Sequence, residues 1–239
     1  MFSSERLTEA LTRVHQHWNA RRELPRNEDE EAVKFTIAIS RETGTYGAAI
    51  ARAVGDRLGW PVYDRELLQR IADDIGVHRA LLDSVDEQQE SWLKECITSL
   101  FAVHAVSQTV YFRRLVEALL SLSKHGDCVI VGRGATRALP LATTLRVRLV
   151  ARLEHRIQAV QREHATSREE AAAQVEKKDR ERNRFVASHF HIDPADPANY
   201  DLVLNTERLS TTECADLILA TLECLRQNAK ARLPALVPA

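Results

Sequence analysis

Short apolar runs alternate with helical stretches along most of this 239-residue chain, and this alternation restricts its fold more than any other feature. The apolar runs contain many β-branched residues, which favour strands. They lie at residues 33–40, 61–63, 128–131, 145–150 and 200–205. Because strands separated by helices usually run in the same direction, the pattern predicts an α/β fold in which helices cover both faces of a parallel sheet.

Helix-start signals and helical periodicity mark the segments between these strands. Ser167 stands three residues before Glu170, and Ser210 stands three before Glu213. In each of these capping boxes the hydroxyl can accept from a backbone amide while the carboxylate reaches back to the serine amide. The predicted helices lie at residues 48–58, 66–75, 87–124 (two helices, broken near 105–108), 154–164, 167–186 and 210–226.

Composition and spacing exclude several function classes. The formal net charge is -1, so the chain as a whole does not favour binding to nucleic acid. No segment approaches the roughly 20 apolar residues of a membrane span, and the N-terminal residues lack the apolar core of a signal peptide. The four cysteines form no CxxC pair and the histidines show no metal-ligand spacing, so we expect neither a disulfide framework nor a metal site. We therefore expect a cytoplasmic protein without a nucleic-acid or membrane partner, in which any anion site is local.

Residues 40–47 connect the first predicted strand to a helix. Gly44 and Gly47 let the backbone curl, and the helix N-terminus offers unpaired amides and the positive end of its dipole, which favour phosphate. The usual phosphate loop, G-x-x-x-x-G-K-S/T, also supplies a lysine and a hydroxyl, but Gly47 stands where the lysine would be. Arg41 or Arg52 could supply positive charge from another direction. The simpler alternative is a tight strand-to-helix connection that binds nothing.

A second cluster, rich in arginine, lies on a predicted helix. At spacings of three and four residues, Asp179, Arg182 and Asn183 share one face, whereas Arg180 and Arg184 share another. Phosphoryl transfer needs cations around the moving group, because charge spreads over its oxygens in the transition state. Arginine suits this role because it stays charged and makes bidentate contacts. The alternative is a solvated face whose Lys/Arg–Glu pairs contribute about 0.2–0.5 kcal/mol each.

Four segments occur in the order found in cytidylate kinase-like proteins, and together they resemble that family. They comprise residues 35–47, 58–64, 129–134 and 178–184, within a similarity that runs from about 33 to 225. Cytidylate kinases are P-loop nucleoside monophosphate kinases that transfer the γ-phosphoryl group of ATP to CMP or dCMP with Mg²⁺. The resemblance implies a three-layer P-loop kinase-like fold with a five-stranded parallel sheet, a helical monophosphate-binding insert at about 65–124 and an arginine lid at about 177–198.

The resemblance also implies roles by position on the acceptor side. Arg133 matches an arginine that holds the CMP phosphate, and Asp64 and Arg65 fall at the edge of the monophosphate-binding region. Gly134 replaces an aspartate that helps to hold the nucleoside in true cytidylate kinases. Residues 40–42, with the sequence Ser-Arg-Glu, resemble a form that the kinase-like branch often has in place of the full phosphate loop.

The resemblance implies further roles in the lid. Arg180 and Arg184 match lid arginines that contact phosphate and base, and Arg182 is the remaining basic lid position. Asp179 falls in the acidic stretch of the lid motif. A lid of this kind would close over the transferring phosphoryl group.

The leading hypothesis is ATP-dependent phosphoryl transfer to a nucleoside monophosphate, most simply CMP or dCMP, which forms the diphosphate and ADP. The predicted ATP-binding residues are Ser40, Arg41, Glu42, Thr43, Gly44, Thr45, Tyr46 and Gly47. Substrate binding is predicted for Asp64, Arg65, Arg133 and Asp179, and catalysis for Arg41, Arg180, Arg182 and Arg184. Mg²⁺ would bridge ATP oxygens and be held largely through water, because the loop hydroxyl is absent.

Two alternatives remain open. A catalytically weak or inactive nucleotide-binding or regulatory protein with a kinase fold is favoured by the missing lysine and by Tyr46 in the loop, and is opposed by the retained arginines. A kinase for another small phospho-acceptor is favoured by Gly134, which removes a nucleoside contact. Catalytic turnover separates the inactive protein from both kinase hypotheses. A panel of acceptors separates the nucleoside monophosphate kinase from the kinase for another small acceptor.

The same considerations divide the chain into regions. We expect a helical extension and linker at residues 1–32, a kinase-like domain at 33–228 and a tail at 229–239. The helical insert contains aromatic residues that suit either a core or a dimer contact. A homodimer through this insert is therefore a further alternative.

Overall fold

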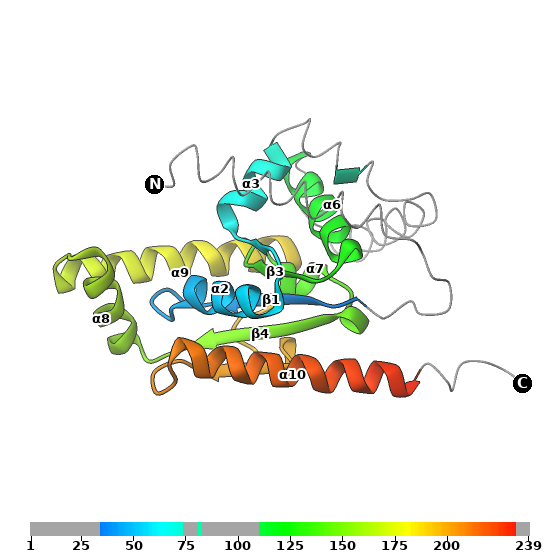
Figure 1. The fold of residues 1–239 in the computed structure, drawn as a ribbon. Coiled ribbons are helices and arrows are strands. Elements are labelled where there is room, and N and C mark those ends of the chain that lie inside the picture. The colour runs from blue at the N-terminus through cyan, green and yellow to red at the C-terminus, as the bar shows by residue number, and fades with distance from the viewer. Residues whose placement is uncertain (1–33, 74–80, 83–109, 233–239) are drawn as a thin grey trace, which may run out of the picture.

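The computed structural model describes residues 34–73, 81–82 and 110–232. Five described strands form one parallel sheet in the order β2-β3-β1-β4-β5 (Figure 1), which confirms the predicted five-stranded parallel sheet. The strands are β1 (Thr36–Arg41), β2 (Val62–Tyr63), β3 (Cys128–Val131), β4 (Thr144–Val150) and β5 (Leu202–Asn205). β1 pairs with β3 on one side and β4 on the other, so the loop after β1 leaves from the middle of the carboxyl edge.

Most of the predicted helices are present within the described ranges. They are α2 (Gly47–Leu58), α3 (Arg65–Asp73), α6 (Val110–His125), α7 (Ala135–Ala138), α8 (Leu153–His164), α9 (Arg168–Phe190) and α10 (Thr211–Arg232), with short 3-10 helices η1 (Leu141–Thr143) and η2 (Pro197–Asn199). Both capping boxes are confirmed, since in each the serine hydroxyl accepts from the glutamate amide and the glutamate carboxylate accepts from the serine amide.

Several boundaries differ from the prediction. α9 and α10 continue beyond the expected ends at 186 and 226, so the predicted tail from 229 begins inside a helix. The short helix α7 was not predicted, because four residues are too few to show helical periodicity. The predicted extension at 1–32 and residues 83–109 of the helical insert, with the dimer contact considered there, lie outside the described residues.

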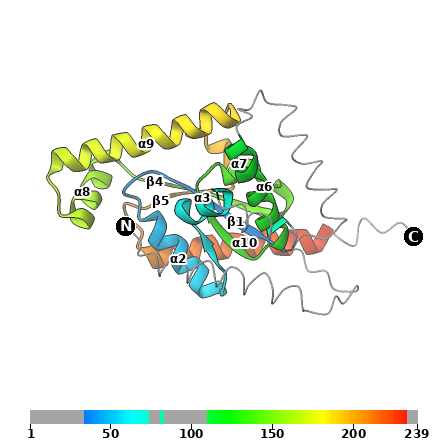
Figure 2. The same ribbon diagram turned by 90° about the horizontal axis from the view of Figure 1, so that it is seen from above.

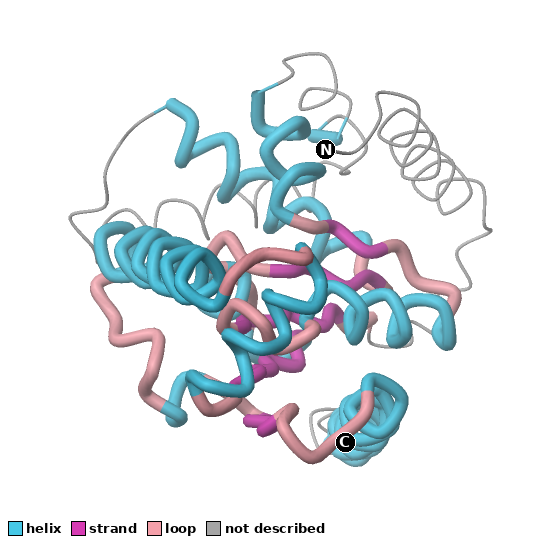
Figure 3. The backbone as a smooth tube through the Cα atoms, turned by 90° about the vertical axis from the view of Figure 1, so that its left-hand side faces the viewer, coloured by secondary structure: helices cyan, strands magenta, loops and turns pink. Residues whose placement is uncertain are grey.

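Helices cover both faces of the sheet (Figure 3). On one face, Ile37 and Ile39 of β1 pack with Ile50 of α2 and Ile218 of α10. On the other face, Ala38 belongs to a cluster formed with α3, α6, α7 and the last turn of α9. Neighbouring side chains of β1 thus alternate between two cores, as expected for a strand. Full burial of each large apolar side chain contributes roughly 1.5–3 kcal/mol, so β1 is held firmly at the base of the loop that follows it.

α8 and α9 form a hairpin along one side of the domain (Figure 2). Ile157 and Val160 of α8 pack against Ala171 and Val175 of α9. The second half of α9 returns toward the sheet and ends at Phe190, which is buried in the core on that face. No helix in the described part of the chain is both long and apolar enough to cross a membrane.

Candidate functional site

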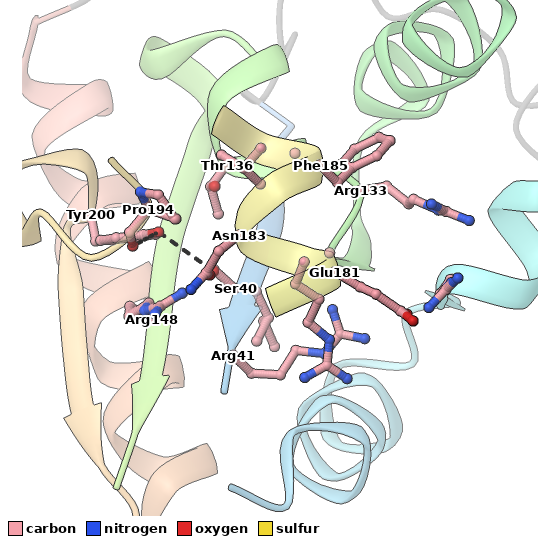
Figure 4. A pocket seen from close by; sticks show the side chains of 16 residues that line it. Ser40, Arg41, Arg133, Thr136, Arg148, Glu181, Asn183, Phe185, Pro194 and Tyr200 are labelled. Carbon is pink, nitrogen blue, oxygen red and sulfur yellow. Dashed lines mark hydrogen bonds between the residues drawn. The ribbon is translucent and has the colours of Figure 1, made fainter. Parts of the chain in front are cut away.

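A cavity of about 300 Å³ lies by the C-terminal ends of β1 and β3, between α3 and α9 (Figure 4). Open parallel sheets commonly bind ligands outside the carboxyl ends of their strands. Five arginines line this cavity: Arg41, Arg65, Arg133, Arg148 and Arg182. Among the described lining residues, Glu181 alone is acidic, and the rest are Ile39, Ser40, Gly132, Gly134, Thr136, Asn183, Phe185, Val186, Pro194 and Tyr200.

Arg41 takes the space at the position of the missing lysine. Its side chain passes Gly47, where an added Cβ would lie 2.8 Å from Arg41 Cγ, and reaches Gly132, where an added Cβ would lie 2.2 Å from Arg41 Nη1. Burial, helped by repulsion from Arg182, lowers the pKa of Arg41 from its ordinary value to about 9. Among the described residues, no acceptor forms a hydrogen bond with its guanidinium. Arg41 is therefore a desolvated cation at the start of α2.

The loop between β1 and α2 folds back on itself and packs against α8. Thr45 is fully buried, and its Oγ1 donates a hydrogen bond to the carbonyl oxygen of Glu42 at 2.8 Å. Gly44 has a φ of +84°, and a Cβ there would lie 2.4 Å from the carbonyl oxygen of Arg156. Both the backbone conformation and the close approach of α8 therefore require glycine at this turn.

The first turn of α2 supplies hydrogen-bond donors beside Arg41. Within the described ranges, the amides of Gly47, Ala48 and Ala49 have no protein acceptor, as expected at a helix start. Tyr46 precedes the helix, and its hydroxyl accepts from Arg162 of α8 at 3.1 Å. Tyr46 does not line the cavity. The start of α2 thus adds free amides and the positive end of its dipole to the site.

Asp179 joins α9 to the loop. Its Oδ1 accepts from the backbone amide of Thr43 at 2.8 Å and from Thr43 Oγ1 at 2.7 Å, and its Oδ2 accepts from Arg156. Arg182, one turn along α9, donates to Thr43 Oγ1 at 2.7 Å. Burial lowers the pKa of Arg182, although Asp179 acts in the opposite direction. These contacts hold Arg182 at the cavity, beside Arg41.

Glu42 lies between two arginines on the sheet side of the loop. Its carboxylate is 3.3 Å from Arg156 Nε and 3.7 Å from Arg148 Nη2. Arg148 of β4 donates from Nη1 to Ser40 Oγ at 2.9 Å, and its guanidinium carbon lies 5.7 Å from the centre of the Tyr200 ring. One carboxylate is thus shared by two cations.

Arg65 and Arg133 line the α3 side of the cavity. Arg133 donates from Nη2 to Gln69 Oε1 at 2.6 Å, and its guanidinium carbon lies 5.3 Å from the centre of the Phe185 ring. Its buried Nε has no hydrogen-bond partner within the described structure. Burial lowers the pKa of Arg133 as well. Two arginines from distant segments therefore face one end of the cavity, as the acceptor assignment requires.

Asp64 has a structural role in addition to the predicted contact with substrate, which stays a prediction. Its Oδ1 accepts from the amides of Glu66 at 3.1 Å and Leu67 at 3.0 Å, so it caps the first turn of α3. Asp64 does not line the cavity. The cap has a local cause, because an aspartate immediately before a helix satisfies orphan amides of that helix.

The arginines of α9 are divided by the geometry of the helix. The prediction that Asp179, Arg182 and Asn183 share a face is confirmed, and this face meets the loop and the cavity. Arg180 and Arg184 are exposed and do not line the cavity, and Arg180 forms a surface ion pair with Glu176. Successive residues on a helix are about 100° apart, so these two side chains cannot share the face of Asp179 and Arg182. The structure therefore does not bring them to the site.

Positive charge exceeds negative charge at this site. Arg156 joins the five lining arginines, whereas the carboxylates here are Glu42, Asp179, Glu181 and Asp64, which partly offsets the lowering of the Arg41 pKa. A desolvated cation without a partner costs several kcal/mol, so the arrangement suits a bound polyanion such as phosphate. In the described part of the chain, no three His, Cys, Asp or Glu side chains are grouped so that they could hold a metal ion.

Gly134 cannot carry a side chain without moving Phe190. Its φ is +71°, and an added Cβ would lie 2.0 Å from Cε2 of the Phe190 ring. We expect Gly134→Ala to lower the free energy of unfolding by roughly 2–4 kcal/mol, through both the left-handed backbone and the overpacking. Chemical denaturation of Gly134→Ala, Phe190→Leu and the double variant measures this. In the double variant, Phe190→Leu should restore part of the unfolding free energy that Gly134→Ala removes. If the effects of the two substitutions on the unfolding free energy are strictly additive, the contact between residue 134 and Phe190 is contradicted.

Sequence reasoning missed Arg148, Arg156 and Tyr200. Arg148 had a detectable signal, because it is a charged residue in a mostly buried central strand, in register with Ser40. Arg156 and Tyr200 had no such signal, because their partners are distant in sequence. Arg156 contacts Thr43, which is 113 residues away, and Tyr200 contacts Ser40, which is 160 residues away. Only the packing of α8 and the segment before β5 brings these residues to the loop.

Comparisons with known proteins bear on the family and the fold. A model of the cytidylate kinase-like family matches residues 36–208. A uronate isomerase from Corynebacterium glutamicum is 31% identical over 161 residues, which are 64% of this chain and 31% of that protein. A cytidylate kinase from Methanopyrus kandleri is 28% identical over 115 residues, which are 44% of this chain and 60% of that protein. The chain thus spans about a third of the length of the uronate isomerase and three fifths of the length of the cytidylate kinase. A solved structure of an uncharacterized protein from Eubacterium ventriosum shares the fold, with a TM-score of 0.64 and 18% identity, over 80% of this chain and 99% of that one.

Proposed function

This chain belongs to the cytidylate kinase-like family, and we propose that it transfers the γ-phosphoryl group of MgATP to a small phosphate-bearing acceptor, with CMP and dCMP as the first candidates. The observation that carries the proposal is Arg41, a desolvated cation in the space of the missing lysine beside the free amides of α2. The match to the uronate isomerase covers 31% of that protein and gives no support for isomerase chemistry here.

The donor phosphates would lie along residues 41–47. The first-turn amides of α2 can donate to phosphate oxygens, and the helix dipole favours negative charge there. Arg41 supplies the cation that a phosphate loop usually takes from its lysine, although it comes from the end of β1. Tyr46 does not oppose this arrangement, since its hydroxyl contacts α8 outside the cavity lining.

The acceptor phosphate would lie at Arg65 and Arg133. An acceptor oxygen would form a bond to the γ-phosphorus while the bond from that phosphorus to the β–γ bridging oxygen breaks. The bridging oxygen leaves with the electron pair as part of ADP. A phosphate dianion carries no proton on the attacking oxygen, so the step requires no general base and depends on positioning and charge.

Arg182 would stabilise the charge that develops during transfer. It is held beside Arg41 by Thr43 and Asp179, so little rearrangement is needed when the charge appears. Mg²⁺ would arrive bound to ATP and keep phosphate oxygens and water as ligands, which is its usual preference. The residues described provide no cluster of three carboxylate, histidine or cysteine ligands that would hold the ion alone.

The test is ADP formation from MgATP with CMP, dCMP, UMP and AMP, and also with 3-phosphoglycerate and 6-phosphogluconate, as acceptors. We expect acceptor-dependent turnover in the wild type and in Arg113→Ala, a control that removes an exposed arginine of α6 paired with Glu117. Turnover should be lost in Arg41→Ala. If folded protein binds an ATP analogue but shows no turnover with any acceptor, the proposal fails in favour of a non-catalytic nucleotide-binding protein.

A further inference from the structure

Resting on that proposed function, we infer that the acceptor carries a second anionic group, and that Arg148 binds this group on the sheet side of the cavity. The acceptor would then be a small phosphomonoester with a carboxylate or second phosphate. A nucleoside monophosphate, whose base is neutral, would leave Arg148 with Glu42, 3.7 Å away and shared with Arg156, as its anion. The sheet-side subsite is defined here by Arg148, Ser40 and Tyr200.

The sheet-side subsite lies across the cavity from Arg133. Figure 4 shows Arg148 and Tyr200 on one side of α9 and Arg133 on the other, with Arg41 below them. Arg148 comes from β4, Ser40 from β1 and Tyr200 from the segment before β5, and all three line the same cavity as Arg133. The two ends thus belong to one cavity.

The guanidinium of Arg148 has more N–H donors than the described residues around it supply with acceptors. Its side chain is only 8% exposed, and its one hydrogen bond among the described residues goes to the neutral hydroxyl of Ser40. Glu42 is 3.7 Å away, beyond hydrogen-bond distance, and lies nearer to Arg156. An arginine has five N–H donors, and a buried cation is costly without an anion. The unfilled donors therefore favour a ligand that brings negative charge.

The groups around Arg148 orient it, and the carboxylate within ion-pair distance, Glu42, is shared with Arg156. The Tyr200 ring lies 5.7 Å from the guanidinium carbon, and the Tyr200 hydroxyl donates to the carbonyl oxygen of Pro194 at 2.8 Å. Glu181, the acidic lining residue, points away from Arg148 in Figure 4. A planar guanidinium held in this way can present two parallel N–H groups to a carboxylate or phosphate.

Aromatic side chains of α6 and α9 pack together beside Gly134. Phe190 fills the space beside Gly134, and its ring centre lies 5.5 Å from that of Phe112. His189 stacks between Phe112 and Phe185, at 4.4 and 4.5 Å between ring centres. Of these aromatic side chains, Phe185 lines the cavity.

Two matched pairs of phosphomonoesters test the inference by calorimetric titration of the full-length protein in the presence of MgADP. The pairs are 3-phosphoglycerate with glycerol 3-phosphate, and 6-phosphogluconate with glucose 6-phosphate. Within each pair the first compound has a carboxylate where the second has neutral oxygen groups. We expect the wild type to bind the carboxylate member of at least one pair about tenfold more tightly, as a single charged contact can provide.

Arg148→Gln should remove this preference, and Arg148→Lys should restore part of it, because a lysine keeps the charge but not the bidentate geometry. The lysine variant also serves if the glutamine variant does not fold. Equal affinity for both members of both pairs in the wild type would overturn the inference. A preference for the carboxylate compounds that survives in the folded glutamine variant would also overturn the inference. So would a glutamine variant that loses affinity for a non-hydrolysable ATP analogue but binds the phosphomonoesters as the wild type does.

These outcomes are separable from those of the proposed function. Turnover of CMP with no preference for the carboxylate compounds would support phosphoryl transfer and refute the sheet-side subsite. An Arg148-dependent preference without ADP formation from any acceptor would support the subsite and refute transfer.

Discussion

Arg41→Ala is expected to lower kcat/KM for MgATP by at least ~100-fold, the usual cost of removing a positioned group that stabilises transition-state charge. The reason is that Arg41 brings a cation to the start of α2, where the usual phosphate loop has a lysine. Steady-state ADP formation at saturating acceptor measures the effect. An unchanged value would show that another cation holds the donor phosphates.

A reciprocal exchange tests the replacement directly. Gly47→Lys alone should impair the protein, because the new Cβ would lie 2.8 Å from Arg41 Cγ. In the Arg41→Ala background the same lysine has room and stands at the usual position in the loop. We therefore expect the double variant to recover at least about tenfold in kcat/KM over Arg41→Ala, a coupling that a double-mutant cycle isolates. A double variant no better than Arg41→Ala would contradict the exchange.

The buried charge of Arg41 should also reduce the stability of the ligand-free protein. Its pKa is lowered to about 9 in the folded state, so the unfolded chain holds the proton more tightly. Stability is therefore gained only as pH rises above about 9, and the full cost is present at neutral pH. We expect Arg41→Met to melt at a higher temperature than the wild type at neutral pH. MgATP should stabilise the wild type more than the variant.

Arg182→Ala is expected to lower kcat by about 100-fold, whereas Arg180→Ala should change it by less than about threefold. Arg182 donates to Thr43 and lines the cavity, but Arg180 forms an exposed ion pair with Glu176. The two variants are closely matched, because both remove an arginine from the same two turns of α9. Steady-state kinetics with kcat and KM resolved separately distinguishes them.

Arg182→Lys provides a further control, because it keeps the charge near Thr43 and should retain more activity than the alanine variant. A large loss in Arg180→Ala together with a small one in Arg182→Ala would reverse the assignment. It would mean that α9 turns its other face to the phosphates when nucleotide binds. The assignment by resemblance of Arg180 and Arg184 would then be correct.

Much of the fold could be predicted because its signals are local. The alternation of side chains along β1 and the two capping boxes involve residues within a few positions of each other. The shared face of Asp179 and Arg182 depends only on helical periodicity. The glycines at 44 and 47 likewise marked the turn, and the structure shows that Gly44 is required by its backbone conformation and by the approach of α8.

The candidate site was less predictable, because a local pattern cannot show which chemical partner a side chain will find. Asp64 has the residue type of a ligand contact but caps α3. Arg182 and Arg180 belong to one motif, and only the docking of Asp179 on Thr43 selects the first for the cavity.

The sequence by itself determined the strands, most of the helices, the phosphate-suited turn and the ordered motifs that identify the family. The tertiary structure alone decided that Arg41 occupies the space beside Gly47, and that Arg148 and Tyr200 meet Ser40. The physical reason is that periodicity and capping act over a few residues. Charge and burial at a site depend on packing between segments more than 100 residues apart, such as Arg148 and Ser40, which are separated by 108.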